Sequence, residues 1–103
     1  MYSRVTLLEI DTMRIDLGAA VDIYREHVLP RLREQEGYRG VVVFTTAEGK
    51  AMLVTFWETE EEARDASGFA ATELERYMTM FKSPPGREQY EVVLAEMPDV
   101  AVR

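Results

Sequence analysis

Stretches rich in β-branched and aromatic residues recur four times along the chain, each bounded by polar or turn-forming residues. This pattern is typical of β-strands. Between the second and third stretches, Glu48-Gly49 is a two-residue connection of the kind that joins a tight antiparallel hairpin. We therefore expect strands at residues 2–10, 38–47, 50–57 and 90–97.

Apolar residues between the first and second strands recur at steps of three and four, which predicts a helix. Asp16 can cap its N-terminus, and Gly37 can close it. Pro30 lies inside this segment, where its missing N–H and its ring should interrupt the helix near Val28-Leu29. The apolar stripe consists of Leu17, Ala20, Val21, Tyr24, Val28 and Leu32.

A second helix is expected after the third strand. Thr59 and Glu62 form a capping box, and the acidic residues beside Glu62 place negative charge at the positive end of the helix dipole. Ser67-Gly68 is a weak point at which this helix can split, and the Ser-Pro-Pro-Gly run at 83–86 ends it. The apolar stripe consists of Ala63, Ala66, Ala70, Leu74, Tyr77, Met78 and Phe81.

The order of these elements predicts an α+β, ferredoxin-like β-α-β-β-α-β fold. Such a fold has one four-stranded antiparallel sheet with two helices on one face. The chain of 103 residues has the length of one domain, and it contains no internal linker or low-complexity tract. We therefore expect a single domain over residues 1–103.

The expected strands are apolar on both faces. In the second strand, Val41 and Val43 lie on one face, whereas Val42 and Phe44 lie on the other. Two helices can cover only one face of a sheet, and a chain of this size buries only about two-thirds of its unfolded surface by itself. The simplest cover for the second face is the same face of another copy. We therefore predict a homodimer packed sheet to sheet.

The charge balance of 12 basic and 19 acidic residues excludes several partners. A net charge of −7 repels phosphate backbones and anionic lipid head groups, so we expect no nucleic-acid partner. The longest apolar run, residues 41–44, is far too short to span a bilayer. The first residues also lack the basic segment and apolar core of a secretory signal. We expect a cytoplasmic protein without a membrane segment.

Residue types that are absent or rare exclude much chemistry. The chain has no cysteine and therefore no thiolate nucleophile, and its single histidine, His27, excludes multi-His metal sites. The acidic run from Glu58 to Glu62 does not suggest a cation site, because consecutive helical residues point in different directions. We expect no metal. No Gly-rich phosphate loop or Ser/His/Asp set is present either.

Two passages resemble those of the antibiotic biosynthesis monooxygenase superfamily, and the likeness covers nearly the whole chain. They are residues 27–40, with His-Val-Leu-Pro and Glu-Gly-Tyr-Arg-Gly, and residues 55–63, Thr-Phe-Trp-Glu-Thr-Glu-Glu-Glu-Ala. The resemblance implies a dimeric α+β barrel made by two sheets, with a pocket in each subunit between the sheet and the helices. Some members resemble cofactor-free oxygenases of polycyclic phenols and others bind and degrade haem, so the fold alone does not decide the function.

The resemblance implies a cofactor-independent monooxygenase acting on a hydrophobic aromatic compound of the phenol or quinol type. The alternative is a non-catalytic dimer of the same fold that binds a small ligand or haem. Haem-degrading members use an Asn on the first strand, a Trp at the end of the third strand and a His on the second helix, and of these only Trp57 is present here. This chain has no Asn, and His27 belongs to the first helix. We therefore do not expect haem degradation by that mechanism.

Five residues are candidates for the site. Cofactor-free oxygenation needs a base that titrates near the working pH, which favours His27, one turn from Tyr24, although it can equally be a half-exposed histidine without a role. Trp57 can wall the pocket and donate its indole N–H to a ligand, or it can be a core residue. Tyr24, Tyr77 and Phe81 complete the expected substrate-binding set, while their helical spacing is also typical of plain core.

Overall fold

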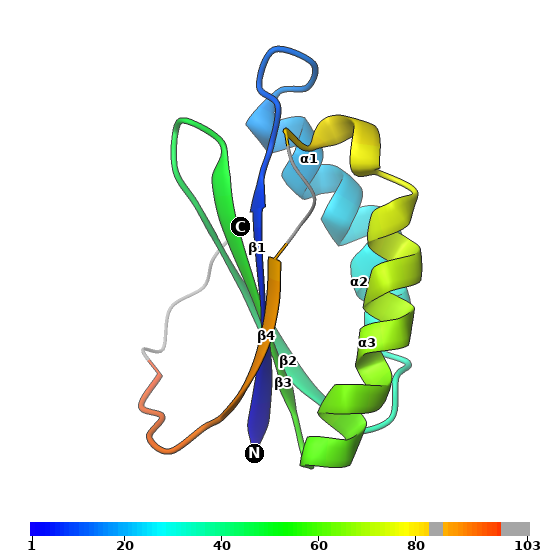
Figure 1. Ribbon diagram of the computed structural model, residues 1–103, viewed down its shortest axis with the longest axis vertical. Coiled ribbons are helices and arrows are strands. Elements are labelled where there is room, and N and C mark those ends of the chain that lie inside the picture. Colours follow the sequence, from blue (N-terminus) through cyan, green and yellow to red (C-terminus); the bar gives the residue numbers. More distant parts are fainter. Residues whose placement is uncertain (83–85, 98–103) are drawn as a thin grey trace.

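The computed structural model of the chain describes residues 1–82 and 86–97, and these form two layers (Figure 1). One layer is a four-stranded antiparallel sheet in the order β2-β3-β1-β4, and the helices cover one of its faces. The elements are β1 (Tyr2–Glu9), α1 (Leu17–Ile23), the π-helical turn η1 (Tyr24–Val28), α2 (Leu29–Leu32), β2 (Tyr38–Thr45), β3 (Lys50–Trp57), α3 (Glu60–Glu75), the 3₁₀ turn η2 (Met78–Met80) and β4 (Gly86–Glu91). The predicted α+β, ferredoxin-like fold is confirmed.

The first helical segment is interrupted where Pro30 predicts an interruption. The backbone N–H of Leu29 donates to the carbonyl of Tyr24, five residues earlier, which makes η1 a π-helical turn. Pro30 then lies in the first turn of α2, where a missing N–H costs little. The helix ends at Leu32, several residues before Gly37. The chain therefore keeps one helical direction with a widened turn in its middle.

The β2-β3 hairpin is present, but its connection is longer than expected. The N–H of Thr46 donates to the Lys50 carbonyl at 2.9 Å, so three residues rather than two separate this pair. Gly49 ends the turn with φ of +99°, and an added Cβ there would lie 2.6 Å from the Ile10 carbonyl oxygen. The turn needs glycine because it packs directly against the end of β1.

The second helix differs from the expectation in two ways. It passes Ser67-Gly68 without a break, and it ends at Glu75 instead of reaching Phe81. The chain after α3 bonds to the end of β1: Asp11 N–H donates to the Met80 carbonyl at 2.7 Å, and Phe81 forms a bridge with Ile10. These long-range bonds replace further helical turns.

The fourth strand was predicted at 90–97 and lies instead at Gly86–Glu91. Its partner decides where it ends, because Glu91 pairs with Tyr2 and Val92 N–H reaches the Met1 carbonyl at the start of β1. Beyond Glu91, β1 has no further residues with which β4 could pair, although the apolar run continues to Met97. The predicted helix stop over residues 83–85 and the tail from residue 98 lie outside the described residues.

The core lies between the helices and the sheet, around Trp57. The Trp57 side chain is packed with Leu32, Ala63 and Ala66, and its ring meets Tyr38 edge to face at 5.9 Å between centroids. Such packing holds the end of β3 against α2 and α3. Within residues 1–82 and 86–97, no helix has the length and apolar character needed to cross a membrane.

The opposite face of the sheet has no helix on it (Figure 1). Cross-strand register places Leu7, Phe44, Met52 and Tyr90 on this face, and each is between 39% and 55% exposed. We call these four residues the open face. The prediction that the strands are apolar on both faces is therefore confirmed, whereas the second copy expected to cover the open face remains a prediction.

Candidate functional site

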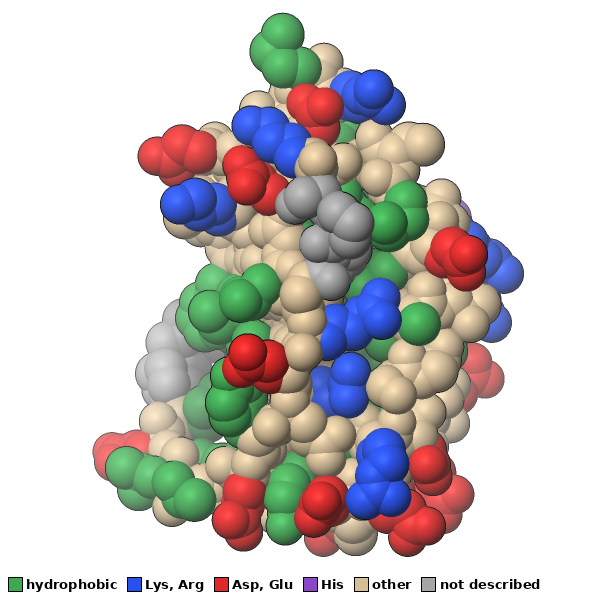
Figure 2. All heavy atoms as spheres, in the orientation of Figure 1, with side chains coloured by type: hydrophobic (Ala, Val, Ile, Leu, Met, Phe, Trp, Pro, Cys, Tyr) green, Lys and Arg blue, Asp and Glu red, His purple; other side chains and the backbone are tan. Residues whose placement is uncertain are grey.

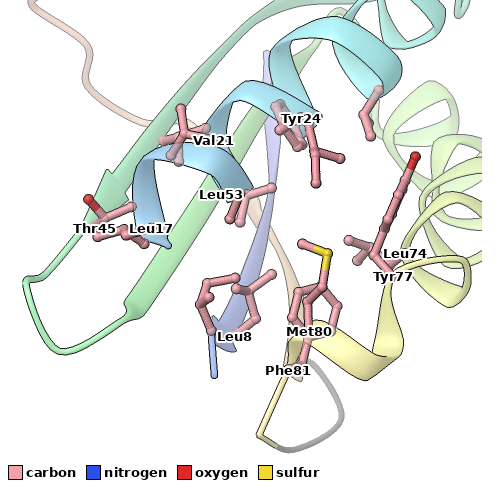
Figure 3. Close-up of a pocket in the computed structure, with 15 residues that line it drawn as sticks. Leu8, Leu17, Val21, Tyr24, Thr45, Leu53, Leu74, Tyr77, Met80 and Phe81 are labelled. Atoms are coloured by element: carbon pink, nitrogen blue, oxygen red, sulfur yellow. The ribbon is translucent and has the colours of Figure 1, made fainter. Parts of the chain in front are cut away.

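An apolar cavity of about 60 Å³ lies between the helix-covered face of the sheet, α1 and the chain that follows α3 (Figure 3). The predicted residues Tyr24, Tyr77 and Phe81 all line it. Tyr24 comes from η1, Tyr77 follows α3, and Phe81 lies just beyond η2. Leu53 and Met80 are among the aliphatic side chains that complete the wall. We call this space the aromatic cavity.

A second cavity of about 40 Å³ adjoins the first and is more polar. The two share Tyr24 in their linings. The second is also lined by Trp57 and Phe69, so aromatic rings continue along the sheet. Its polar wall is formed by Arg4, Thr6, Thr55 and Glu73. We call this space the polar cavity.

Trp57 lies in the wall of the polar cavity, where the sequence analysis expected it to contact a ligand. Only 1% of the residue is exposed, and its indole Nε1–H donates to the Thr55 hydroxyl oxygen at 2.9 Å. The indole N–H that was expected to donate to a ligand therefore already donates to Thr55. The ring can still form a wall of the cavity, since it belongs to the lining.

Glu73 is a buried carboxylate in the same wall, with 1% of the residue exposed. Its Oε1 forms an ion pair with Arg31 of α2, while no aligned hydrogen bond from the described residues reaches that oxygen. The Arg31 guanidinium also lies over the Phe69 ring, 5.8 Å from its centroid. The ion pair with Arg31 therefore holds the Glu73 carboxylate in place.

Arg4 is a half-buried cation on the sheet side of the polar cavity. Its guanidinium donates to the Gln89 side-chain oxygen at 3.4 Å. Among residues 1–82 and 86–97 it has no ion pair with a carboxylate. Burial lowers the pKa of Arg4, and the nearby charge of Arg87 lowers it further. The polar cavity thus contains a cation without a neutralising partner.

The Tyr24 phenol lies where the two cavities meet. Burial raises its pKa well above the ordinary value of 10, with a smaller contribution from Tyr38. Tyr24 is therefore a neutral phenol at physiological pH. As a neutral phenol it has an O–H that can donate a hydrogen bond at this point of the cavities.

His27, the base expected from the sequence, is exposed on η1 and belongs to neither cavity lining. Val28, four residues after Tyr24, belongs to the apolar stripe and is only 6% exposed, whereas His27 lies at the edge of that stripe, on the solvent side of η1. The structure therefore brings Trp57, Tyr24, Tyr77 and Phe81 along one pair of cavities and leaves His27 outside them.

The polar wall is not predicted by the sequence. The spacing of Glu73 indicates its position, since it lies three residues after Ala70, seven after Ala66 and four before Tyr77, and so on the apolar side of α3. No sequence pattern indicates that Arg4 and Thr55 belong to the site, because only the register of β1 against β3 places them opposite each other. No group of three or more residues suited to hold a metal occurs in the described part of the chain.

No protein-family model matches the chain. In sequence it is 28% identical over 95 residues to the uncharacterized protein Rv2558 of Mycobacterium tuberculosis, a match that covers 91% of this chain and 39% of that protein. The chain thus spans about two-fifths of the length of the curated relatives it matches.

Several solved structures share the fold. A monooxygenase from the gene ActVA-Orf6 of Streptomyces coelicolor, in complex with the ligand nanaomycin D, has a TM-score of 0.71 at 17% identity, covering 95% of this chain and 92% of that one. A variant of MhuD with two manganese protoporphyrin IX bound per active site has a TM-score of 0.67 at 16% identity, and the match covers 95% of this chain and 100% of that one.

A dimeric ferredoxin-like protein from an uncultured marine organism has a TM-score of 0.64 at 12% identity, and the match covers 95% of this chain and 100% of that one. At these identities the likeness concerns the fold. The expected resemblance to the antibiotic biosynthesis monooxygenases is confirmed at that level.

Proposed function

We propose that this chain belongs to the antibiotic biosynthesis monooxygenases and oxidises a planar aromatic phenol or quinol without a cofactor. One observation carries the proposal: the aromatic cavity, lined almost wholly by apolar side chains, adjoins a polar cavity that contains the buried carboxylate Glu73. The apolar part can bind flat rings, and the polar part can hold the reacting oxygen substituent. The solved monooxygenase of the same fold adds support.

The chemistry balances without an added reductant for an anthrone-type substrate, whose ring CH₂ is in equilibrium with an enol. Loss of the enol proton leaves an anion rich enough in electrons to reduce dioxygen. The carbon loses its two hydrogens and becomes a carbonyl with one oxygen atom, and the other oxygen atom leaves as water. Four electrons leave the carbon and four reduce O₂. The protein therefore has to bind the rings, accept a proton and stabilise an anion.

Glu73 is the base that position favours. A base must lie within hydrogen-bond reach of the proton it removes, so geometry is tested before pKa. The Glu73 carboxylate is in the wall of the polar cavity, whereas the His27 side chain is outside both cavities. Because Arg31 pairs with Oε1, the second carboxylate oxygen is the one available to accept a proton.

We further propose that the working unit is a homodimer formed through the open face. Leu7 and Phe44 on that face are 48% and 55% exposed in the single chain. Apolar side chains gathered on one sheet face are typical of an interface between copies. A dimeric protein of the same fold supports this arrangement.

The test of the proposed reaction is oxygen uptake with an anthrone-type substrate. Glu73→Gln should lower kcat about 100-fold or more, the usual size of a general-base contribution. Glu75→Gln removes an exposed carboxylate of the same helix and should keep the activity. His27→Ala distinguishes the two candidate bases. If kcat falls in His27→Ala and is unchanged in Glu73→Gln, the base is His27.

The alternative function is tested with haemin. A saturable shift of the Soret band, with no oxygen uptake on any anthrone- or quinol-type substrate, would overturn the proposed oxidation and identify a binding protein instead. Uptake without a Soret shift supports the proposal.

A further inference from the structure

We infer that Arg4, with the hydroxyl groups of Thr6 and Thr55, binds a carboxylate carried by the ligand, so that the substrate class is an aromatic carboxylate. The inference rests on the proposed function only for the aromatic part of the ligand. The carboxylate of the ligand is inferred from the charges and hydrogen-bond donors in the polar cavity alone.

Arg4 has hydrogen-bonding capacity that the described residues do not use. A guanidinium has five N–H donors in a planar fork that fits a carboxylate with two parallel bonds. Within the described part of the chain Arg4 makes one side-chain hydrogen bond, at 3.4 Å, to the neutral Gln89. A partly buried charge is costly unless an opposite charge pairs with it. A bound carboxylate would supply both the missing acceptors and the missing charge.

A second cation, Arg87, lies near Arg4. In the β1-β4 register, Arg4 pairs with Gln89 and Thr6 pairs with Arg87, so the two arginines lie on the same side of adjacent strands. Arg87 is exposed and, among residues 1–82 and 86–97, has no ion pair either. Figure 2 shows Lys and Arg side chains gathered between β4 and α3, on a protein whose net charge is −7. An anion beside Arg4 would relieve this repulsion.

Two hydroxyl groups lie close to Arg4 in the sheet. Thr55 lies directly opposite Arg4 in the β1-β3 register, and Thr6 is two residues further along β1. The Thr55 oxygen accepts the Trp57 indole N–H, a bond that does not use the O–H donor of the same hydroxyl. The donors of Arg4, Thr6 and Thr55 therefore line one wall of the polar cavity.

The carboxylate in the same cavity does not neutralise Arg4. Glu73 is already paired with Arg31, on the helix side of the cavity. The charge that remains without a partner is therefore positive and lies on the sheet side. A ligand carboxylate would lie against Arg4, with its rings along Trp57 and Tyr24 toward the aromatic cavity.

The experiment compares two probes with the same rings, 2-naphthoate and the neutral 2-naphthalenemethanol. Calorimetry measures their affinities, and ¹⁵N NMR follows the indole N–H of Trp57, the only tryptophan of the chain. We expect naphthoate to bind about tenfold more tightly, which corresponds to about 1.4 kcal/mol. Arg4→Gln should remove this preference and the naphthoate-induced shift of the indole signal. Arg64→Gln removes an exposed charge on α3 and should keep both the naphthoate preference and the shift of the indole signal.

Equal affinities for the two probes, or a preference that survives in Arg4→Gln, would overturn the inference. If Arg4→Gln does not fold by circular dichroism, Arg4→Lys is used: it keeps the charge and loses the planar fork, so the preference should fall without vanishing. Because binding is measured without turnover, the result is separate from the oxygen-uptake test. A naphthoate preference in a protein that consumes no oxygen would retain the carboxylate site and reject the oxidation.

Discussion

The indole N–H of Trp57 donates to the hydroxyl oxygen of Thr55, two residues earlier on the same face of β3, at 2.9 Å. This bond satisfies the only polar group of a side chain that is almost fully buried. It also orients the Thr55 hydroxyl in the wall of the polar cavity. One local contact therefore belongs both to the core and to the candidate site.

Thr55→Val should destabilise the protein, because valine has the same shape but leaves the indole N–H without an acceptor. We expect a loss of about 1–3 kcal/mol in the free energy of unfolding. Urea denaturation followed by Trp57 fluorescence measures it. Thr55→Ser keeps the hydroxyl and should recover most of the loss, and a Val variant as stable as the unchanged protein would show that the bond contributes nothing.

Tyr24→Phe should change the stability at alkaline pH. The pKa of the folded Tyr24 is raised above 10 by burial, so above pH 10 the unfolded chain loses the proton while the folded protein keeps it. Stability then falls as pH rises, by about 1.4 kcal/mol per pH unit for one proton. Below pH 10 this contribution is fully present. Denaturation curves between pH 9 and 11 should show a smaller slope in Tyr24→Phe.

Tyr38→Phe is the comparison for this prediction. Burial also raises the pKa of Tyr38, but the charge and hydrogen bond of Arg33 oppose the rise. The change in slope should therefore be smaller than in Tyr24→Phe. The same slope in Tyr24→Phe and in the unchanged protein would contradict the burial of this phenol.

Gly37→Ala should be destabilising at the junction between the first helical segment and β2. Gly37 has φ of +83°, and an added Cβ would lie 2.8 Å from Cβ of Glu62 and closer still to its carboxylate. That carboxylate accepts a hydrogen bond from the Thr59 hydroxyl at the start of α3. Backbone strain alone costs roughly 1–3 kcal/mol. Thermal unfolding measures the change.

Gly68→Ala is the matched control for that substitution. An added Cβ at Gly68 meets no atom within 4 Å, and the residue lies inside α3. Alanine there should stabilise the protein by about 0.5–1 kcal/mol. A destabilised Gly68→Ala variant would show that the difference between these two glycines does not come from local space and backbone angle.

Phe44→Glu should convert the proposed dimer into single chains of 11.8 kDa. A charge on the open face would have to lose its water on association, and the apolar side chains of that face do not replace it. Sedimentation at micromolar concentration distinguishes the two masses, with Phe44→Leu as a control that keeps the face apolar. Single chains in the unchanged protein would reject the dimer.

Much of the fold could be predicted from local patterns. The spacing of apolar residues identified four strands and two helical segments, and Pro30 located the interruption between η1 and α2. The ends of the last elements could not be predicted this way. β4 stops at Glu91 because Tyr2 starts its partner strand, and α3 stops at Glu75 because Phe81 pairs with Ile10.

By itself, the sequence determined the order of the elements, the apolar character of both sheet faces and the aromatic residues around Trp57, because these follow from periodicity and side-chain type. The tertiary structure decided which polar groups meet. Arg4, Thr55 and Glu73 are far apart in the chain and share a cavity only through the β1-β3 register and the packing of α3 on the sheet. His27, on the exposed side of η1, lies outside this cavity.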